Sequence, residues 1–166
     1  MIKFRAIERE DLPTLRDWRN ELKDLFRQYR YLNMENQEQW FGGLTNDNSQ
    51  VMYAVTNMEG LLIGVAGWYN IDWLNRHADL SIYIGGEKGK GYGTATLNEL
   101  HRIAFMELNL LTVRLEVFDF NPAKTLYERV GYKKVGVWRN AHYHNGEYHD
   151  SILMDMTVDD WKKAVV

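Results

Sequence analysis

A short turn that contains three glycines carries the clearest chemical signal in the sequence. The segment from Lys88 to Thr94 reads Lys-Gly-Lys-Gly-Tyr-Gly-Thr, and it lies between a strand-like run at 78–84 and a helix-like run at 94–108. Glycine lets the backbone approach a ligand closely and adopt positive φ, and the free N–H groups at a helix N-terminus attract anions. The turn therefore predicts a ligand that bears phosphate, such as a nucleotide-containing cofactor.

Two familiar phosphate-binding patterns do not match this turn. A P-loop needs Gly-Lys followed by Ser or Thr, whereas Gly86 leads to Lys90 and Gly91. A Rossmann turn needs a third glycine where this chain has Thr94 or Thr96. A strand-to-helix turn without a ligand stays open as the structural alternative.

The turn resembles motif A of the GNAT superfamily, the acyl-CoA-dependent N-acyltransferases, which reads Gln/Arg-x-x-Gly-x-Gly/Ala before a long helix. Lysine replaces Gln or Arg at the first position, which keeps the charge but loses bidentate hydrogen bonding. The resemblance implies that acetyl-CoA is the cosubstrate. Backbone amides of the turn would hold its pyrophosphate, and the preceding strand would pair with its pantetheine arm. The cofactor-binding residues expected on this ground are Ile82, Tyr83, Ile84, Lys88, Gly89, Lys90, Gly91, Tyr92, Gly93 and Thr94.

A second segment resembles another motif of the same family. Residues 111–118 alternate like a strand, and Asn121 then begins a short helix that ends at Gly131. The pattern Asn-x-x-Lys-x-x-Tyr-x-x-x-Gly-Tyr is similar to GNAT motif B. The resemblance implies that Tyr127 faces the CoA sulfur as general acid, Asn121 bonds the pantetheine arm, and Lys124 meets CoA phosphates. A packed aromatic ring, a helix cap and a solvated lysine are the structural alternatives.

Acetyl transfer from a thioester to an amine needs a neutral amine, a donor to the carbonyl oxygen and a proton for the departing thiolate. A phenol is protonated at neutral pH, so Tyr127 can supply that proton. Asp79 is expected to act as the base, directly or through water, with Glu116 as its rival. Ordered water without a dedicated base is the third alternative.

Residues upstream of the glycine turn are the candidates for the acceptor pocket. Trp and Arg side chains together suit a flat or anionic acceptor, with core packing and solvated faces as the alternatives. These elements resemble the GNAT branch that acetylates amino sugars of nucleotide carriers or protein N-termini, while amino acids and polyamines also stay open. The residues from Arg27 to Arg30 favour an anionic acceptor, whereas the net charge of −3 would suit a cationic one. The substrate-binding residues expected here are Trp18, Arg19, Asn20, Arg27, Gln39 and Trp40.

Two other interpretations compete with this enzyme. A non-catalytic CoA-binding regulatory domain would keep Gly91, Gly93 and Asn121 but lack a working acid, which the intact Tyr127 disfavours. A metal site is suggested by three histidines near an Asn-Gly turn, namely His142, His144 and His149. Because that turn predicts a hairpin tip, solvated histidines are the better interpretation, and no metal is expected.

Composition limits the remaining classes of protein. The 166 residues suit one domain spanning 1–166, and 45% of them are apolar. The 20 basic and 23 acidic residues predict no nucleic-acid partner. The absence of cysteine excludes disulfides and fits a reducing cytoplasm, and no apolar run approaches the roughly 20 residues of a membrane span. The expectation is a cytoplasmic enzyme that takes a small-molecule or peptide amine, with a homodimer as one candidate assembly.

Alternation and helical spacing predict the elements that position these residues. The expected fold class is α+β, with a mixed, largely antiparallel central sheet flanked by helices. The GNAT resemblance implies a sheet that is splayed between its fourth and fifth strands, with CoA in the opening. The strands are expected at 4–7, 51–55, 62–69, 79–84, 111–118, 135–139 and 148–156, and the helices at 11–22, 36–44, 94–108 and 121–131.

Overall fold

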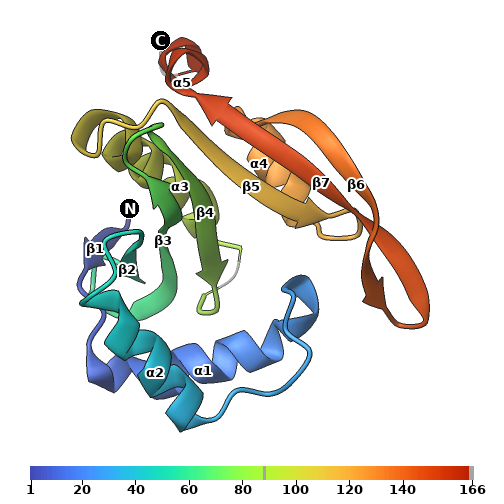
Figure 1. Cartoon of the computed structure of the whole chain (residues 1–166). Coiled ribbons are helices and arrows are strands. Elements are labelled where there is room, and N and C mark those ends of the chain that lie inside the picture. Colours follow the sequence, from blue (N-terminus) through green and yellow to red (C-terminus); the bar gives the residue numbers. More distant parts are fainter. Residues whose placement is uncertain (88, 165–166) are drawn as a thin grey trace.

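The computed structural model describes residues 1–87 and 89–164. One mixed sheet runs through the molecule in the order β1-β2-β3-β4-β5-β7-β6 (Figure 1). Only β4 and β5 are parallel neighbours, and all other neighbouring pairs are antiparallel. The predicted α+β class is confirmed. The strands are β1 (Lys3–Arg5), β2 (Val51–Thr56), β3 (Leu62–Asp72), β4 (His77–Ile84), β5 (Thr112–Phe118), β6 (Lys133–His144) and β7 (Glu147–Thr157).

Helices cover both faces of the sheet. Leu12 and Leu15 of α1 form one core cluster with Val65 and Tyr83, and α2 adds Trp40 to it. The other face carries the larger cluster, to which α3, α4 and α5 contribute. No helix in these described ranges combines the length and apolarity needed to cross a membrane. The helical elements are η1 (Arg9–Asp11), α1 (Leu12–Glu21), η2 (Lys23–Leu25), α2 (Met34–Leu44), α3 (Tyr92–Arg102), η3 (Ile103–Glu107), α4 (Ala123–Arg129) and α5 (Val158–Ala164).

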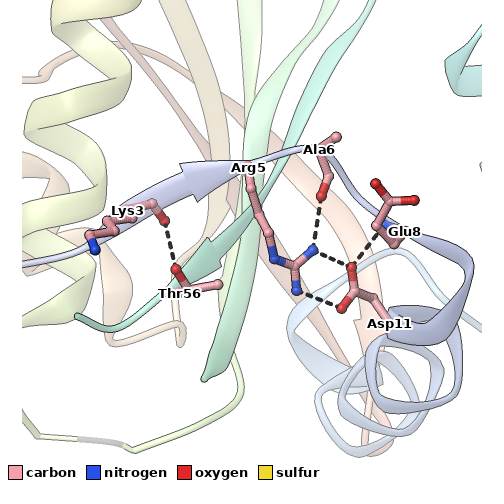
Figure 2. A network of polar contacts seen from close by, with 6 residues as sticks. All are labelled: Lys3, Arg5, Ala6, Glu8, Asp11 and Thr56. Carbon is pink, nitrogen blue, oxygen red and sulfur yellow. Dashed lines mark hydrogen bonds and ion pairs between the residues drawn. The ribbon is translucent and has the colours of Figure 1, made fainter. Parts of the chain in front are cut away.

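A polar network fixes the start of α1 to the edge strand β1 (Figure 2). The guanidinium of Arg5 donates two hydrogen bonds to the Asp11 carboxylate, at 2.7 and 2.8 Å, and one to the Ala6 carbonyl at 2.9 Å. The Glu8 N–H donates to Asp11 at 2.9 Å. Burial by itself would raise the pKa of Asp11, but Arg5 and the Glu8 amide hold it below its usual value. This network sets the direction in which α1 crosses the sheet.

Several elements differ from the sequence expectation at their ends. The helix expected at 94–108 consists of α3 and a π turn, η3, because Ile103–Glu107 leaves the α-helical hydrogen-bond pattern. Strands β6 and β7 are longer than expected, since the pair continues to a turn at Asn145 and Gly146, whose φ values are 49° and 88°. That turn was predicted from the Asn-Gly pair. Helix α5 was missed because it is short and lies at the end of the described chain.

The buried side chain of His101 in α3 makes the free energy of unfolding depend on pH. Its side chain is 1% exposed, its Nε2 lies 3.1 Å from the Tyr132 hydroxyl, and burial lowers its pKa to about 4. The unfolded chain binds a proton at His101 near pH 6.5, whereas the folded chain resists protonation until about pH 4. We therefore expect the His101 contribution to the free energy of unfolding, present above pH 6.5, to fall by roughly 3 kcal/mol as the pH drops to 4.

Denaturant titrations of the wild type and His101→Gln between pH 7 and 4 check this expectation. The variant should be less stable at pH 7 and lose less stability on acidification. Equal losses in the two proteins would assign the acid sensitivity to other groups.

Candidate active site

The two parallel strands at the centre of the sheet separate along their length. Strands β4 and β5 pair only at their first residues, and the last paired positions are Asp79 and Arg114. Beyond them, residues 80–84 of β4 still pair with β3, and residues 115–118 of β5 still pair with β7. The predicted splay between the fourth and fifth strands is therefore confirmed. The inner edge of β4 is left without a neighbouring strand, so its main chain can pair with an extended ligand.

A cavity of about 840 Å³ occupies this opening and passes through the sheet. Helices α1 and α2 and the chain between them line one end, and α4 lines the other with the first turn of α3. This volume is in the range of small-molecule and cofactor sites. Ten of the side chains that line it bear on the chemistry, namely Arg19, Phe26, Arg27, Gln37, Trp40, Tyr69, Tyr83, Glu116, Asn121 and Tyr127.

The glycine turn leads into α3 beside the cavity. Gly89 and Gly91 have φ of 84° and 75°, which supports the predicted need for glycine. The Ala95 N–H makes the first intrahelical hydrogen bond, to Gly91 at 3.2 Å, so the amides of the three preceding residues have no acceptor within the helix. Gly93 lines the cavity. These free amides and the unpaired edge of β4 are suited to bind the two parts of a CoA molecule that the GNAT resemblance implies for them.

Some of the other residues expected to bind the cofactor line the cavity, and others lie outside its lining. Ile82, Tyr83 and Ile84 line the cavity, whereas Gly89, Lys90, Gly91, Tyr92 and Thr94 do not. The Lys90 ammonium is bonded to Glu87 at 2.6 Å, and the Tyr92 hydroxyl donates to the same carboxylate at 3.3 Å. Lys88 lies outside the described residues. Lys124 does not line the cavity, and its ammonium pairs with Glu128 at 3.3 Å.

Tyr127 of α4 and Asn121, two residues before the helix begins, both line the cavity. The Asn121 Oδ1 accepts the Ala123 N–H at 2.9 Å, so this side chain caps the helix, which begins one residue later than the sequence suggested. Burial raises the pKa of Tyr127 to about 12, and its ring packs edge-on against Tyr132 at 5.9 Å between centroids. The phenol therefore stays protonated throughout the neutral pH range and can act as a proton donor.

The two candidate carboxylates differ in position. Asp79 does not line the cavity; its Oδ1 accepts from Arg114 at 3.1 Å and its Oδ2 from Asn70 at 3.0 Å. Glu116, the rival, lines the cavity and forms an ion pair with Arg27. Both carboxylates are thus held by a guanidinium, and only Glu116 faces the space where an acceptor would lie.

Half of the residues expected to bind the acceptor line the cavity, namely Arg19, Arg27 and Trp40. Trp18 instead packs on Gly85, where an added Cβ would lie 2.0 Å from the indole. Asn20 ties down the chain after α1, because its Oδ1 accepts the Leu32 N–H at 2.8 Å and its Nδ2 donates to the Leu32 carbonyl at 2.9 Å. Gln39 is exposed on α2.

Sequence reasoning missed several of the residues in the cavity wall. Gln37 is 5% exposed and lies three residues before Trp40, so the helical spacing of α2 could have placed it on the same face. Tyr69 and Phe26 had no such signal, because β3 and the chain after η2 reach the cavity only through tertiary packing.

The three histidines of the β6–β7 arm are half-buried and contact aromatic rings, so the expectation that they are solvated at a loop tip is wrong. The rings of His142 and Phe118 are 4.0 Å apart and nearly parallel, and His144 and His149 contact Phe120 at 5.0 and 4.7 Å. Within residues 1–87 and 89–164, no three His, Cys, Asp or Glu side chains are grouped to hold a metal.

Separated parallel strands beside a glycine turn are the arrangement expected of one class of enzyme, the acyl-CoA-dependent acyltransferases. The Acetyltransferase (GNAT) domain family matches residues 4–153, and the chain belongs to this family. It is an acetyl-CoA-dependent N-acetyltransferase, and it transfers an acetyl group to an amine.

Known relatives have the same fold. The chain is 28% identical over 135 residues to spermidine N(1)-acetyltransferase of Vibrio cholerae, covering 79% of this chain and 78% of that protein. The crystal structure of spermidine N-acetyltransferase from V. cholerae in complex with CoA and spermine has a TM-score of 0.91 and 27% identity, over 97% of this chain and 98% of that one. A dodecameric structure of spermidine N-acetyltransferase from V. cholerae has a TM-score of 0.84 and 27% identity, over 96% and 95% of the two chains.

Proposed function

We propose that the acceptor is a small-molecule amine that enters from the α1–α2 side and attacks the thioester carbonyl directly. One observation carries this proposal: the same cavity is lined by α1 and α2 at one end and by Tyr127 at the other. Acceptor and thioester therefore meet in one space, where positioning alone can lower the barrier by several kcal/mol. No covalent intermediate on the protein is needed.

In this proposal, Asn121 and the inner edge of β4 hold the pantetheine arm, and the amides before Ala95 hold the pyrophosphate. Acetyl-CoA supplies the activated acetyl group. The amine nitrogen forms a bond to the acetyl carbon, the carbon–sulfur bond breaks, and the sulfur takes the phenolic proton of Tyr127. The proton lost by the amine passes to water, from which the phenolate is reprotonated. The burial of Tyr127 and its pKa of about 12 support its role as donor.

We assign removal of the amine proton to ordered water, because both carboxylates near the opening are bound to arginines. Asp79→Asn is therefore expected to keep kcat within about tenfold of the wild type, since loss of a true general base costs about 100-fold or more. The pH–rate profile of kcat/KM checks this, with Glu116→Gln measured in parallel. If Asp79→Asn alone abolishes the acidic limb of the profile, Asp79 is the base after all.

Polyamines are the first acceptor class in this proposal. The similar V. cholerae enzymes are spermidine N-acetyltransferases, and one was solved with spermine. The net charge of −3 on this chain also suits a cationic acceptor. Polyamines replace the amino sugars and protein N-termini expected from the sequence, because those classes gain no support from these relatives.

A second acceptor class is an amine that also carries an acidic group. It is favoured by a specific observation, the presence of Arg19 and Arg27 in the wall of the cavity. Guanidinium groups recognise carboxylate and phosphate through paired hydrogen bonds.

Calorimetric titration with CoA, followed by an acceptor panel read by mass spectrometry, tests the proposed function. We expect CoA to bind and at least one primary amine to gain the mass of an acetyl group in the presence of acetyl-CoA. CoA binding without turnover of any amine would favour the regulatory alternative, and a protein that does not bind CoA would refute the proposal.

A further inference from the structure

Arg19 of α1 occupies the wall of the cavity on the acceptor side. Its guanidinium lies over the Phe26 ring, 3.8 Å from the centroid, and its Nε donates to the Gln28 Oε1 at 3.1 Å. Tyr69 and Tyr83 also line the cavity. The Phe26 ring thus covers the Arg19 guanidinium on one side, and its terminal N–H groups make no hydrogen bond to the described residues and can donate to a ligand in the cavity.

Arg19 has no carboxylate partner in the part of the chain that the structure describes. Its side-chain hydrogen bond goes to the neutral amide of Gln28. The guanidinium groups of Arg5, Arg27 and Arg114, in contrast, each bind an aspartate or glutamate. Burial lowers the pKa of Arg19, yet a guanidinium remains protonated at neutral pH. A half-buried cation without an anion is costly unless a ligand supplies the opposite charge.

The charged side chains that line the cavity also favour an anionic ligand. Among residues 1–87 and 89–164, two arginines face it, Arg19 and Arg27, and one carboxylate, Glu116. Arg27 already binds that carboxylate, and it also donates to the Ala141 carbonyl at 2.8 Å and the Ser151 hydroxyl at 3.2 Å. A polyamine would bring further positive charges into a space where the described residues offer no free carboxylate, and like charges in such a space repel.

We infer that the natural acceptor is a primary amine that also bears a carboxylate or phosphate group, and that Arg19 binds this group and selects the acceptor. The inference rests on the proposed N-acetyltransferase function and chooses between its two acceptor classes. Arg19 acts in binding and orientation, so its loss raises KM more than it lowers kcat.

Matched pairs of amines test this inference directly. Ornithine differs from putrescine by one carboxylate, lysine differs from cadaverine in the same way, and phosphoethanolamine differs from ethanolamine by one phosphate. With the wild type, the anionic member of a pair should be preferred by about 10- to 100-fold in kcat/KM, the range expected for a charge-assisted hydrogen bond. The first two pairs report on a carboxylate and the third on a phosphate.

Arg19 variants then assign the preference to one side chain. Arg19→Met should raise KM for the preferred anionic amine by about 10- to 100-fold with a smaller change in kcat, and Arg19→Lys should restore part of the loss. Arg19→Glu should favour the cationic member of each pair. Arg30→Met is the matched control, because Arg30 lies in the chain between α1 and α2, is exposed, and does not line the cavity.

Binding of each amine to the complex of the protein with CoA is measured alongside turnover. The binding data then report on the preference for anionic amines even when the panel does not contain the natural acceptor. Tighter binding of the anionic members, weakened in Arg19→Met and unchanged in Arg30→Met, supports the inference. Equal or tighter binding or turnover of the cationic members by the wild type overturns it while the N-acetyltransferase function stands. Failure to bind CoA would refute the proposed function itself, and the inference with it.

Discussion

Gly91→Val is expected to raise the dissociation constant for acetyl-CoA by about 100-fold, which corresponds to roughly 2.7 kcal/mol. Gly91 precedes α3 with φ of 75° and ψ of 9°, a left-handed conformation that a β-branched residue adopts only under strain. No atom lies within 4 Å of the position of an added Cβ, so the fold itself need not clash. The expected loss comes from a turn that relaxes to negative φ and moves its amides away from the pyrophosphate.

Gly146→Val is the matched control for this experiment. Gly146 has φ of 88° and an equally open environment, but it lies in the turn between β6 and β7 and not in the turn that leads into α3. Both variants should lose similar stability in thermal unfolding, and only Gly91→Val should lose heat in a calorimetric titration with acetyl-CoA. Wild-type affinity in Gly91→Val would refute the role of the glycine turn in binding the cosubstrate.

Tyr127→Phe is expected to lower kcat by about 100-fold or more, the usual contribution of a positioned proton donor. The ring keeps its packing against Tyr132, so acetyl-CoA binding should change little. Because burial raises the pKa of Tyr127 to about 12, the wild-type kcat should show no decline from its ionisation at neutral or mildly alkaline pH. Steady-state kinetics over this pH range, together with calorimetry of both proteins, checks the two statements.

Tyr132→Phe is the control that distinguishes the loss of a proton donor from the loss of packing beside Tyr127. Tyr132 is buried beside Tyr127, bonds His101 through its hydroxyl and does not line the cavity. Its loss should lower the free energy of unfolding by about 1 kcal/mol and leave kcat near the wild-type value. A normal kcat in Tyr127→Phe, or equal losses in the two variants, would remove the assignment of Tyr127 as the acid.

The sequence predicted the features that depend on a few neighbouring residues. Gly89 and Gly91 were expected at positive φ, and Asn145 and Gly146 were expected to form a two-residue hairpin turn, because few other residues adopt these conformations without strain. Alternating apolar residues also predicted the strands of the sheet, since a strand exposes successive side chains on opposite faces. Arguments of this kind placed Tyr127 and Asn121 on the helix that reaches the cavity.

Tertiary structure decided which of several neighbouring polar residues face the ligand. Trp18, Arg19 and Asn20 are consecutive, yet only Arg19 lines the cavity, because successive helical residues point about 100° apart and the packing of α1 on the sheet selects one direction. Asp79 lies at the last paired position before β4 and β5 separate, so its carboxylate meets Arg114 instead of the opening. The point of separation depends on how the helices pack against both halves of the sheet, and no local pattern of residues encodes it.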